Sequence, residues 1–410
     1  MRWSSLWPNL RKLTFKRKLQ KIIMINIKTF NNISDKGLSR LPSDAYNISE
    51  DHADPDAIIL RSAKLHDMEI GSNLKAVGRA GAGTNNVPVD RMSEKGVVVF
   101  NAPGANANAV KELVIVGMLL ACRNIVQAWD YAANVTGTTE EQNKAVEDGK
   151  KKYVGYELPG RTLGVIGLGA IGVQVANAAA ALGMRVVGFD PTITVKSAWK
   201  LSSEVQEMGS VDELVKQADF ISFHVPLIDA TKNLLNAERI ASMKDGAVVL
   251  NFARDGIVDD DAVLDAIESG KIQAYVSDFP AEKLKGNKQV ITLPHLGAST
   301  AEAEENCAIM VADQLKDFMV NGNIKNSVNF PDIKLARVGN ARLAIANKNM
   351  PDMVAQISHV LGKENANILH MRNESRNGLA YTLIDLETAA SDAALAEITA
   401  IDGVLNARQI

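Results

Sequence analysis

Short, continuously apolar runs alternate with helix-like stretches along the middle of this chain. Six such runs occur between residues 124 and 296: 162–167, 185–190, 219–226, 247–253, 273–279 and 289–294. Strands that are buried on both faces of a parallel sheet have this composition, because neither face alternates towards water. The repeated strand–helix pattern therefore predicts a doubly wound α/β domain with a parallel sheet over residues 124–296.

Residues 24–123 show the same alternation, with apolar runs at 25–30, 57–61, 74–81 and 97–104. A helix is predicted from about residue 300 to 320, and its apolar positions are Cys307, Met310, Val311, Leu315 and Phe318. In a chain of this plan that helix returns to the first region. We therefore predict a discontinuous, flavodoxin-like domain made of residues 24–123 and 297–325.

A different pattern follows the polar link at 321–332. It predicts a strand at 341–347, a helix at 353–361, strands at 367–374 and 379–387, a helix at 392–401 and a strand at 403–409. The βαββαβ order predicts a ferredoxin-like domain over residues 335–410.

The composition agrees with a globular protein of several domains. The chain has 410 residues, of which 46% are hydrophobic and 23% charged, and this length is too great for one compact core. The longest notable apolar stretch, 113–122, is half a membrane span and so predicts a buried helix. Cys122 and Cys307 both fall in apolar helical stretches, which favours buried thiols and a cytoplasmic protein, and no metal site is predicted.

The net charge of −3 is unevenly distributed. The first 23 residues carry seven Lys and Arg and no acid, so the rest of the chain carries −10. A body this acidic argues against nucleic-acid binding. The basic segment fits either an organelle-targeting presequence or an extension ahead of Met24, and we exclude residues 1–23 from the fold.

A glycine motif follows the first apolar run of the central domain. Gly167, Gly169 and Gly172 form G-x-G-x-x-G between a strand at 162–166 and a helix at 171–182. The first glycine permits a tight turn, the second lets the backbone approach a pyrophosphate, and the third allows close helix–strand packing. The helix N-terminus attracts the phosphates. The alternative is a glycine turn that binds nothing.

Asp190 lies 18 residues beyond the last glycine, at the end of the next strand. A carboxylate there accepts hydrogen bonds from ribose hydroxyls and repels a 2′-phosphate, so NAD is favoured over NADP. Asp190 could instead only cap the strand end.

Three further residues sit at or just past the ends of apolar runs: Arg254, Glu282 and His295. Oxidation of a secondary alcohol needs a base for the hydroxyl proton, and imidazole is suited to that task. A neighbouring carboxylate would stabilise the imidazolium, and an arginine would bind a substrate carboxylate bidentately. We assign these roles to His295, Glu282 and Arg254.

Each assignment has a structural alternative. His295 could be structural, Glu282 could be a solvated charge beside a lysine-rich loop, and Arg254 could cap a turn. His224 also ends a strand, and we predict that it forms a wall of the cofactor pocket.

Eight motifs resemble the D-isomer-specific 2-hydroxyacid dehydrogenase family, and its phosphoglycerate branch in particular. They are LRS at 60–62, GAGTNNV at 81–87, FNAPGANANAVKELV at 100–114, GLGAIG at 167–172, HVPL at 224–227, NFARDGIVDDDAV at 251–263, DFPAE at 278–282 and PHLGAST at 294–300. The resemblance covers residues 24–410, because the tail is similar to an ACT regulatory domain.

The resemblance implies oxidation of 3-phospho-D-glycerate with NAD, at the start of serine biosynthesis. It implies cofactor contacts by Gly167, Gly169, Ala170, Ile171, Gly172, Asp190, His224, Pro226, Phe252, Ala253, Asp278, His295, Gly297 and Ala298. It implies substrate contacts by Arg61, Ser62, Arg79, Asn106 and Arg254.

Two features depart from the family pattern. The glutamate lies in a compact DFPAE segment, which weakens the role of Glu282. In the tail, Asn347 stands where the family has a serine-binding histidine and Asp352 where it has a glycine, whereas Asn349 and Asn367 match. An amino-acid effector bound by Asn347, Asn349 and Asn367 is therefore an open prediction.

Two other functions compete with this one. The chain could be a dehydrogenase of another 2-hydroxy acid, such as glycerate or 2-hydroxyglutarate. It could also be an NADH-sensing binding protein, although a sensor has no need of a general base. We predict a homo-oligomer, a dimer or tetramer, because the family pairs through its cofactor domains and a ferredoxin-like tail leaves sheet edges open.

Overall fold

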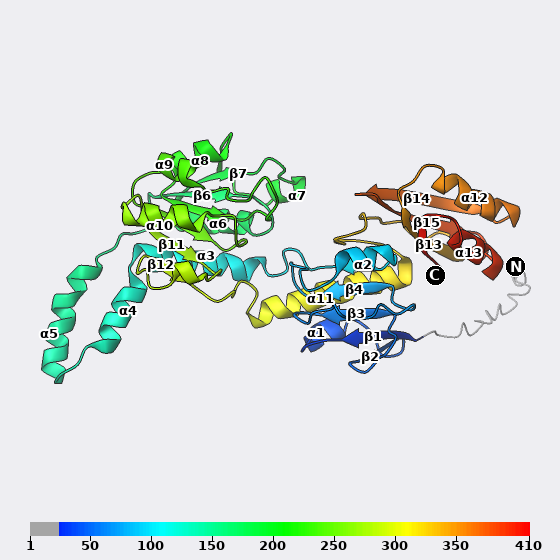
Figure 1. The fold of residues 1–410 in the computed structure, drawn as a ribbon, viewed down its shortest axis with the longest axis horizontal. Coiled ribbons are helices and arrows are strands. Elements are labelled where there is room, and N and C mark those ends of the chain that lie inside the picture. Colours follow the sequence, from blue (N-terminus) through cyan, green and yellow to red (C-terminus); the bar gives the residue numbers. More distant parts are fainter. Residues whose placement is uncertain (1–23) are drawn as a thin grey trace, which may run out of the picture.

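The computed structural model describes residues 24–410, and the interpretations of residues 1–23 lie outside this range. Three sheets form in three successive parts of the chain, as Figure 1 shows. The strand order of each sheet agrees with the α/β class and the ferredoxin-like tail predicted from the sequence. No helix within residues 24–410 is both long and apolar enough to cross a bilayer.

The first sheet is parallel and has the order β2-β1-β3-β4-β5, which is the flavodoxin-like order. Its strands are β1 (Ile25–Thr29), β2 (Tyr46–Ser49), β3 (Ala57–Leu60), β4 (Ala76–Arg79) and β5 (Val98–Phe100). Two short helices belong to this part, α1 (Asp35–Leu38) and α2 (Val89–Glu94). Strand β2 was not foreseen, because its half-buried pattern lacks the continuous apolar run of the other four.

Helix α11 (Ala301–Asn321) returns from the central domain and packs on β3, β4 and β5. Its buried positions include Cys307, Val311, Leu315 and Phe318, which share one core with the first sheet. The fit is close at Gly78, where any Cβ would overlap the side chain of Val311. The glycine therefore lets the helix lie directly on β4.

The second sheet is parallel and has the order β12-β11-β10-β9-β6-β7-β8. Its strands are β6 (Thr162–Ile166), β7 (Arg185–Phe189), β8 (Gln206–Glu207), β9 (Phe220–Phe223), β10 (Ala247–Asn251), β11 (Ile272–Ser277) and β12 (Val290–Thr292). The covering helices are α3 (Ala107–Cys122), α6 (Gly172–Ala181), α7 (Val195–Ala198), α8 (Val211–Gln217), α9 (Ala237–Ser242) and α10 (Asp260–Glu268), with a 3-10 turn η2 (Glu282–Leu284). This is a Rossmann-type sheet, whose strand order reverses between β6 and β9.

A helical hairpin projects from this domain, at the left of Figure 1. It consists of α4 (Ile125–Asn134), α5 (Thr139–Gly149) and the 3-10 turn η1 (Lys150–Tyr153). Thr138 and Glu141 form a capping box that starts α5, so the charge-rich residues 139–149 form a regular helix. Helix α4 has no buried residue, and Trp129 is 69% exposed.

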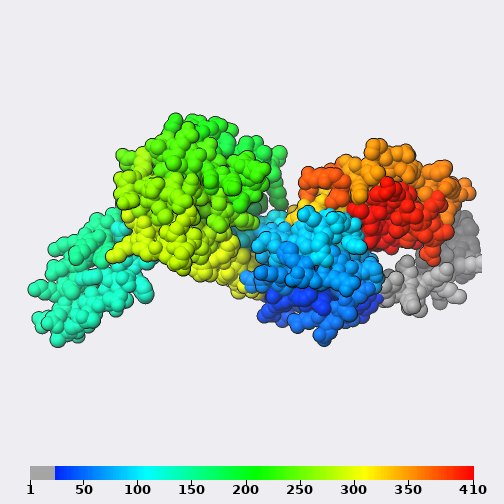
Figure 2. Space-filling view, viewed as in Figure 1, coloured from blue at the N-terminus to red at the C-terminus, as the bar shows by residue number. Residues whose placement is uncertain are grey.

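The third sheet is antiparallel and has the order β14-β15-β13-β16. Its elements follow the predicted βαββαβ order: β13 (Ala341–Lys348), α12 (Met353–Lys363), β14 (Ile368–Arg376), β15 (Leu379–Leu386), α13 (Asp392–Thr399) and β16 (Val404–Gln409). The space-filling view shows this unit, in orange and red, seated against the first domain (Figure 2).

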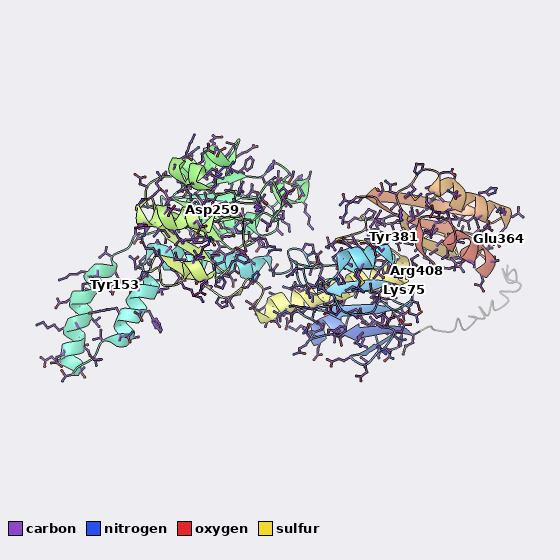
Figure 3. The ribbon with its side chains drawn as sticks, viewed as in Figure 1. Lys75, Tyr153, Asp259, Glu364, Tyr381 and Arg408 are labelled. Carbon is purple, nitrogen blue, oxygen red and sulfur yellow. The ribbon has the colours of Figure 1, made fainter. Side chains whose placement is uncertain are left out.

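The two helices cover one face of the third sheet, and the other face packs on the first domain. Tyr381, labelled in Figure 3, lies against Phe318 of α11 and Phe330. The guanidinium of Arg408 stacks over Phe318 with 4.2 Å between the carbon and the ring centre. The tail is therefore joined to the first domain by an aromatic core as well as by the chain.

Candidate active site

The carboxyl ends of five neighbouring strands of the second sheet carry most of the residues singled out from the sequence. The glycine loop follows β6, His224 follows β9, Arg254 lies beyond β10, Asp278 follows β11 and His295 lies beyond β12. All strands of this sheet are parallel, so these ends meet at one edge. Ligands of open α/β sheets bind at this edge, beside the point where the strand order reverses.

The glycine loop has the geometry that a phosphate needs. Gly167 has a φ of +92°, and a Cβ there would lie 2.6 Å from the carbonyl oxygen of His224. A Cβ on Gly172 would overlap the carbonyl oxygen of Gly167. A Cβ on Gly169 would meet no protein atom within 4 Å, because it would project into an open crevice.

That crevice has a volume of about 340 Å³ and lies between the glycine loop and the first domain. It is lined by these predicted cofactor residues: Gly169, Ala170, Ile171, His224, Pro226, Phe252, Ala253, Asp278, His295 and Gly297. Ala298 lines the neighbouring cavity instead, and Gly167 and Gly172 shape the loop from behind.

Two buried polar atoms facing this crevice have no partner within residues 24–410: Nδ1 of His224 and Oδ1 of Asp278. Such atoms normally have a hydrogen-bond partner. The Nε2 atom of His224 lies 2.9 Å from the Ser222 hydroxyl, and loss of hydration lowers the pKa of His224 to about 3. The imidazole is therefore neutral, and the two atoms fit a ligand that both donates and accepts, as a nicotinamide carboxamide does.

Asp190 has a second task that the sequence did not indicate. Its carboxylate accepts hydrogen bonds from the backbone N–H of Leu168 at 2.8 Å and of Thr192 at 2.9 Å. The first bond ties the end of β7 to the glycine loop. Asp190 therefore shapes the loop, and its contact with a ribose remains a prediction.

The glycine loop gives a matched pair of variants. We expect Gly169→Ala to fold normally and to weaken NADH binding by at least tenfold, because its methyl group would occupy the space of the phosphates. Gly172→Ala should also lower the melting temperature, because its methyl group collides with the protein itself. Fluorescence titration with NADH and thermal unfolding separate the two effects. Unchanged NADH affinity in Gly169→Ala would contradict this placement of the phosphates.

Arg254 and His295 both border the crevice and a second cavity of about 860 Å³. The ring of Phe279 packs edge-on against the His295 imidazole, with 5.0 Å between ring centres. Asp278 is the carboxylate that the structure places near His295. Burial raises the pKa of Asp278, and the charges of His295 and Arg254 oppose that rise.

Glu282 is not brought to His295 in this structure. Its side chain is 88% exposed on η2 and pairs with Lys285 three residues later. The compact segment between β11 and η2 turns the glutamate towards solvent. Glu282 therefore lies as a solvated surface charge, which was the structural alternative to its catalytic role. Its predicted role as the partner of the histidine would require residues 280–286 to move.

The second cavity gathers three arginines from two domains. Arg61 and Arg79 come from the ends of β3 and β4, and Arg254 comes from the central domain. Arg61 pairs with Glu304 of α11 at 2.6 Å, whereas Arg79 and Arg254 form no ion pair within residues 24–410. Burial lowers the pKa of Arg79, and the charges of Arg61 and Arg254 add to this effect. The cavity is therefore an electropositive site for an anion.

Asn106 and Ser62 were also predicted to contact the substrate, and the structure places them differently. Asn106 lines this cavity, whereas the Ser62 side chain does not. Instead the backbone of Ser62 donates to the side chain of Asn31 at 2.9 Å, as do the backbones of Arg61 and Ala63. Ser62 therefore belongs to the turn that positions Arg61.

The sequence interpretation missed Asn31 and Asn86, which hold this turn. The Asn86 side chain donates to the carbonyl oxygens of Arg61 and Ala63. An asparagine directly after a strand is a signal for a turn of this kind, and Asn31 has a φ of +67°.

The three predicted effector residues do not form one site within a chain. Asn347 and Asn349 lie at the end of β13 where Ala380 and Leu379 pair, whereas Asn367 precedes Ile368, which pairs with Leu386 at the other end of the sheet. Asn347 is buried with an unpartnered side-chain oxygen, and Asn367 donates to Glu387.

A dinucleotide crevice at the switch point, with a histidine and three arginines beside it, is typical of an NAD-dependent dehydrogenase. Residues 115–299 match the family model of the D-isomer specific 2-hydroxyacid dehydrogenase NAD binding domain. The chain belongs to this family, and its cofactor is NAD.

Curated relatives of this chain include D-3-phosphoglycerate dehydrogenases and a hydroxypyruvate reductase. D-3-phosphoglycerate dehydrogenase from Haemophilus influenzae is 34% identical over 353 residues, which are 83% of this chain and 82% of that protein. The enzyme of that name from Methanocaldococcus jannaschii is 39% identical, over 70% of this chain and 54% of the relative, so the match spans about half of that longer protein. Hydroxypyruvate reductase from Thermotoga maritima is also 39% identical, over 63% of this chain and 83% of the relative.

A solved structure has the same fold. NAD⁺-bound 3-phosphoglycerate dehydrogenase from Entamoeba histolytica superposes with a TM-score of 0.59 at 24% identity. The match covers 75% of this chain and 99% of that one.

Proposed function

We propose that this chain oxidises 3-phospho-D-glycerate to 3-phosphooxypyruvate with NAD, as the first step of L-serine biosynthesis. The observation that carries the proposal is the arginine cavity beside His295. A phosphorylated hydroxy acid has two anionic ends, and the cavity offers Arg79 and Arg254, which have no ion-pair partner within residues 24–410, together with Arg61. Guanidinium groups bind carboxylate and phosphate bidentately.

His295 would serve as the acid–base group in this reaction. Its ring lies where the cofactor crevice meets the arginine cavity. The residues of the cofactor crevice would hold NAD, which would supply the acceptor for the hydride that leaves C2 when the C2–H bond breaks. The C2 hydroxyl proton passes to the His295 imidazole, and the C2–O bond becomes a carbonyl. In the reverse direction the imidazolium returns the proton to that oxygen. Arg254 would hold the carboxylate so that C2 faces the cofactor.

A second candidate is a reductase of an unphosphorylated acid, which the Thermotoga relative supports by its name. The deciding experiment is NADH oxidation with 3-phosphooxypyruvate, hydroxypyruvate and 2-oxoglutarate. We expect the phosphorylated acid to have the highest kcat/KM. Preference for hydroxypyruvate would keep the mechanism and change the substrate. No turnover with any of them, despite NADH binding, would favour the sensor alternative.

The Asp278 carboxylate supplies a pH prediction. The Asp278 carboxylate lies near His295, and its negative charge favours the imidazolium that donates the proton in keto-acid reduction. Asp278→Asn removes that charge and should therefore favour the neutral imidazole, which cannot donate the proton. The variant should therefore lose activity at a lower pH than the wild type. An unchanged pH profile would contradict the prediction.

Glu282→Gln, measured in parallel, tests the role that the resemblance implies for the glutamate. A shift of the same sign in this variant would mean that residues 280–286 carry Glu282 to His295 when substrate binds. No shift would leave Asp278 as the carboxylate that acts on the histidine.

We also propose a cytoplasmic homo-oligomer. Both cysteines are buried free thiols, as is usual in a reducing compartment. The projecting hairpin exposes Ile125, Val126 and Trp129 on α4, an apolar surface that a second copy would cover. An effector site that uses Asn347 and Asn367 together would likewise need two copies, since the residues lie at opposite ends of one sheet. Sedimentation as a monomer at micromolar concentration would contradict the oligomer.

A further inference from the structure

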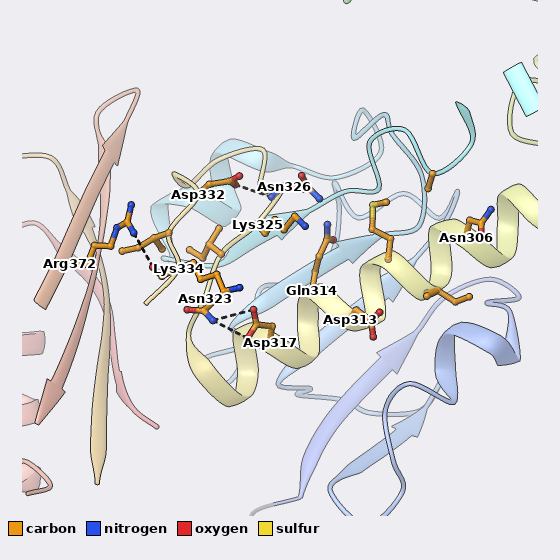
Figure 4. A pocket seen from close by; sticks show the side chains of 15 residues that line it. Asn306, Asp313, Gln314, Asp317, Asn323, Lys325, Asn326, Asp332, Lys334 and Arg372 are labelled. Atoms are coloured by element: carbon orange, nitrogen blue, oxygen red, sulfur yellow. Dashed lines mark hydrogen bonds between the residues drawn. The ribbon is translucent and has the colours of Figure 1, made fainter. Parts of the chain in front are cut away.

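One large cavity in residues 24–410 lies outside the active site. It has a volume of about 970 Å³, within the range of small-molecule sites. Most of its walls come from three segments: the outer face of α11, residues 323–334, and Arg372 on β14 of the third sheet (Figure 4). Ala105, ahead of α3, completes the lining. It shares no lining residue with the cofactor crevice or the arginine cavity.

Gln314 of α11 gives this cavity a buried polar group without a partner. The residue is 8% exposed, and neither Oε1 nor Nε2 has a hydrogen-bond partner within residues 24–410. Figure 4 shows its side chain extending from the helix into the space that Lys325 also borders. A buried amide left unpaired is costly, so this side chain calls for an occupant that both donates and accepts.

Some charged groups around the cavity already have ion-pair or hydrogen-bond partners within the protein. Asp313 pairs with Arg40, Asp317 accepts from Asn321 and Asn323, and Asp332 accepts from the Asn326 backbone. In contrast, Lys325 and Lys334 form no ion pair within residues 24–410. The groups on which an occupant could depend therefore include the buried amide of Gln314 and the two ammonium groups of Lys325 and Lys334.

From this arrangement we propose that the cavity binds a small carboxylate with a hydrogen-bond donor on the neighbouring carbon. The carboxylate would pair with Lys325 or Lys334 and accept from Nε2 of Gln314. The adjacent amino or hydroxyl group would donate to Oε1. α-Amino acids and α-hydroxy acids share this chemistry, and a simple carboxylate lacks the donor.

An occupant of this cavity would touch two domains at once. Arg372 reaches it from the third sheet, where its guanidinium also donates to the carbonyl oxygen of Lys334 at 3.0 Å. At its other end α11 carries Glu304, the partner of Arg61 in the arginine cavity. Gln314 lies ten residues further along, about 15 Å at 1.5 Å per residue. The ligand would thus bind on the helix that also borders the proposed substrate site.

Isothermal titration of the full chain, without NADH or substrate, tests the proposal. The probes are L-serine, glycine and L-alanine, then D-glycerate and L-lactate, with propionate as the acid that lacks a donor. We expect at least one member of the first two series to bind and propionate to bind at least tenfold more weakly. Absence of binding by both series would overturn the proposal and leave water as the occupant.

Variants locate the bound probe. Gln314→Met keeps the side-chain volume, and Lys325→Met changes an exposed residue that should not affect folding; each should weaken binding about tenfold. The matched control is Lys316→Met, an exposed lysine on α11 outside the cavity, which should leave affinity unchanged. Binding that survives both cavity variants but is lost in Asn367→Ala would place the probe on the third domain and overturn the site. Because no turnover is measured, failure here leaves the proposed reaction untouched.

Discussion

Replacing His295 with alanine should lower kcat for keto-acid reduction by about a thousandfold while NADH still binds. The imidazole borders both the cofactor crevice and the arginine cavity and can take up or release a proton there. A positioned acid–base group contributes about 10²–10⁴ in rate, and the alanine variant leaves the arginines to hold the substrate. Steady-state kinetics with 3-phosphooxypyruvate, together with NADH fluorescence titration, measure the two quantities separately.

His370→Ala is the matched control, since this histidine is exposed on β14 and lines neither cavity. We expect its kcat to equal that of the wild type. If His295→Ala retained full turnover, the proton transfer would have to be assigned to another group. If it lost NADH binding as well, the variant would report on the cofactor crevice and not on catalysis.

A large loss of stability is expected when the ion pair of Arg342 and Asp385, which lies in the third domain near its link to the first, is broken. Arg342 and Asp385 are both 0% exposed, and the guanidinium donates twice to the carboxylate, at 2.6 and 2.8 Å. Arg342 also donates to the carbonyl oxygens of Asn321 and Leu335, at 2.9 Å each. Arg342→Met should therefore destabilise the protein by about 3–5 kcal/mol, because it leaves a buried carboxylate and two carbonyls unpaired.

Urea unfolding followed by circular dichroism measures this loss. Lys363→Met is the control, because its pair with Glu397 is half-exposed and should cost at most about 1 kcal/mol. Exchanging both partners, Arg342→Met with Asp385→Leu, should recover part of the loss. Equal stability of Arg342→Met and wild type would show that the buried pair contributes nothing.

The pH dependence of this effect follows from Asp385. Burial alone would raise its pKa, but the hydrogen bonds from Arg342 and the Val338 backbone hold it below its ordinary value. A carboxyl group with a lowered pKa stabilises the folded state above its unfolded pKa of about 3.9, and the benefit is lost as pH falls through the folded value. The difference between wild type and Arg342→Met should therefore be constant near pH 7 and shrink in acid.

The order of elements could be predicted because apolar periodicity is a local property. The continuously apolar runs became the central strands β6, β9, β10 and β11, and the βαββαβ tail formed as expected. Strand β2 and the α4–α5 hairpin were not predicted, because such a prediction depends on apolar periodicity. The former is half-buried and the latter has few buried residues, so neither leaves a strong apolar pattern.

The candidate site was predictable only in part. His224 was singled out because it follows a strand end, and parallel strands bring their carboxyl ends together, whereas Asp278 was indicated only by the family resemblance. Glu282 was predicted to lie beside His295 because it also follows a strand end. It lies, however, on a 3-10 turn after a short loop, and in such a turn a shift of one residue changes the direction in which a side chain points. Asn31 and Asn86 act through backbone contacts some 30 and 25 residues away in sequence, which no local pattern reveals.

The sequence by itself determined the doubly wound cofactor domain, the glycine loop and the ferredoxin-like tail, because each depends on the spacing of residues within one segment. Only the tertiary structure decided which side chains share a cavity. The meeting of Arg61, Arg79 and Arg254, the burial of Arg342 with Asp385 and the unpaired amide of Gln314 all depend on how α11 and the third sheet pack against the first domain. Contacts between distant segments are selected by the shape of the folded whole, so the pattern of one segment does not contain them.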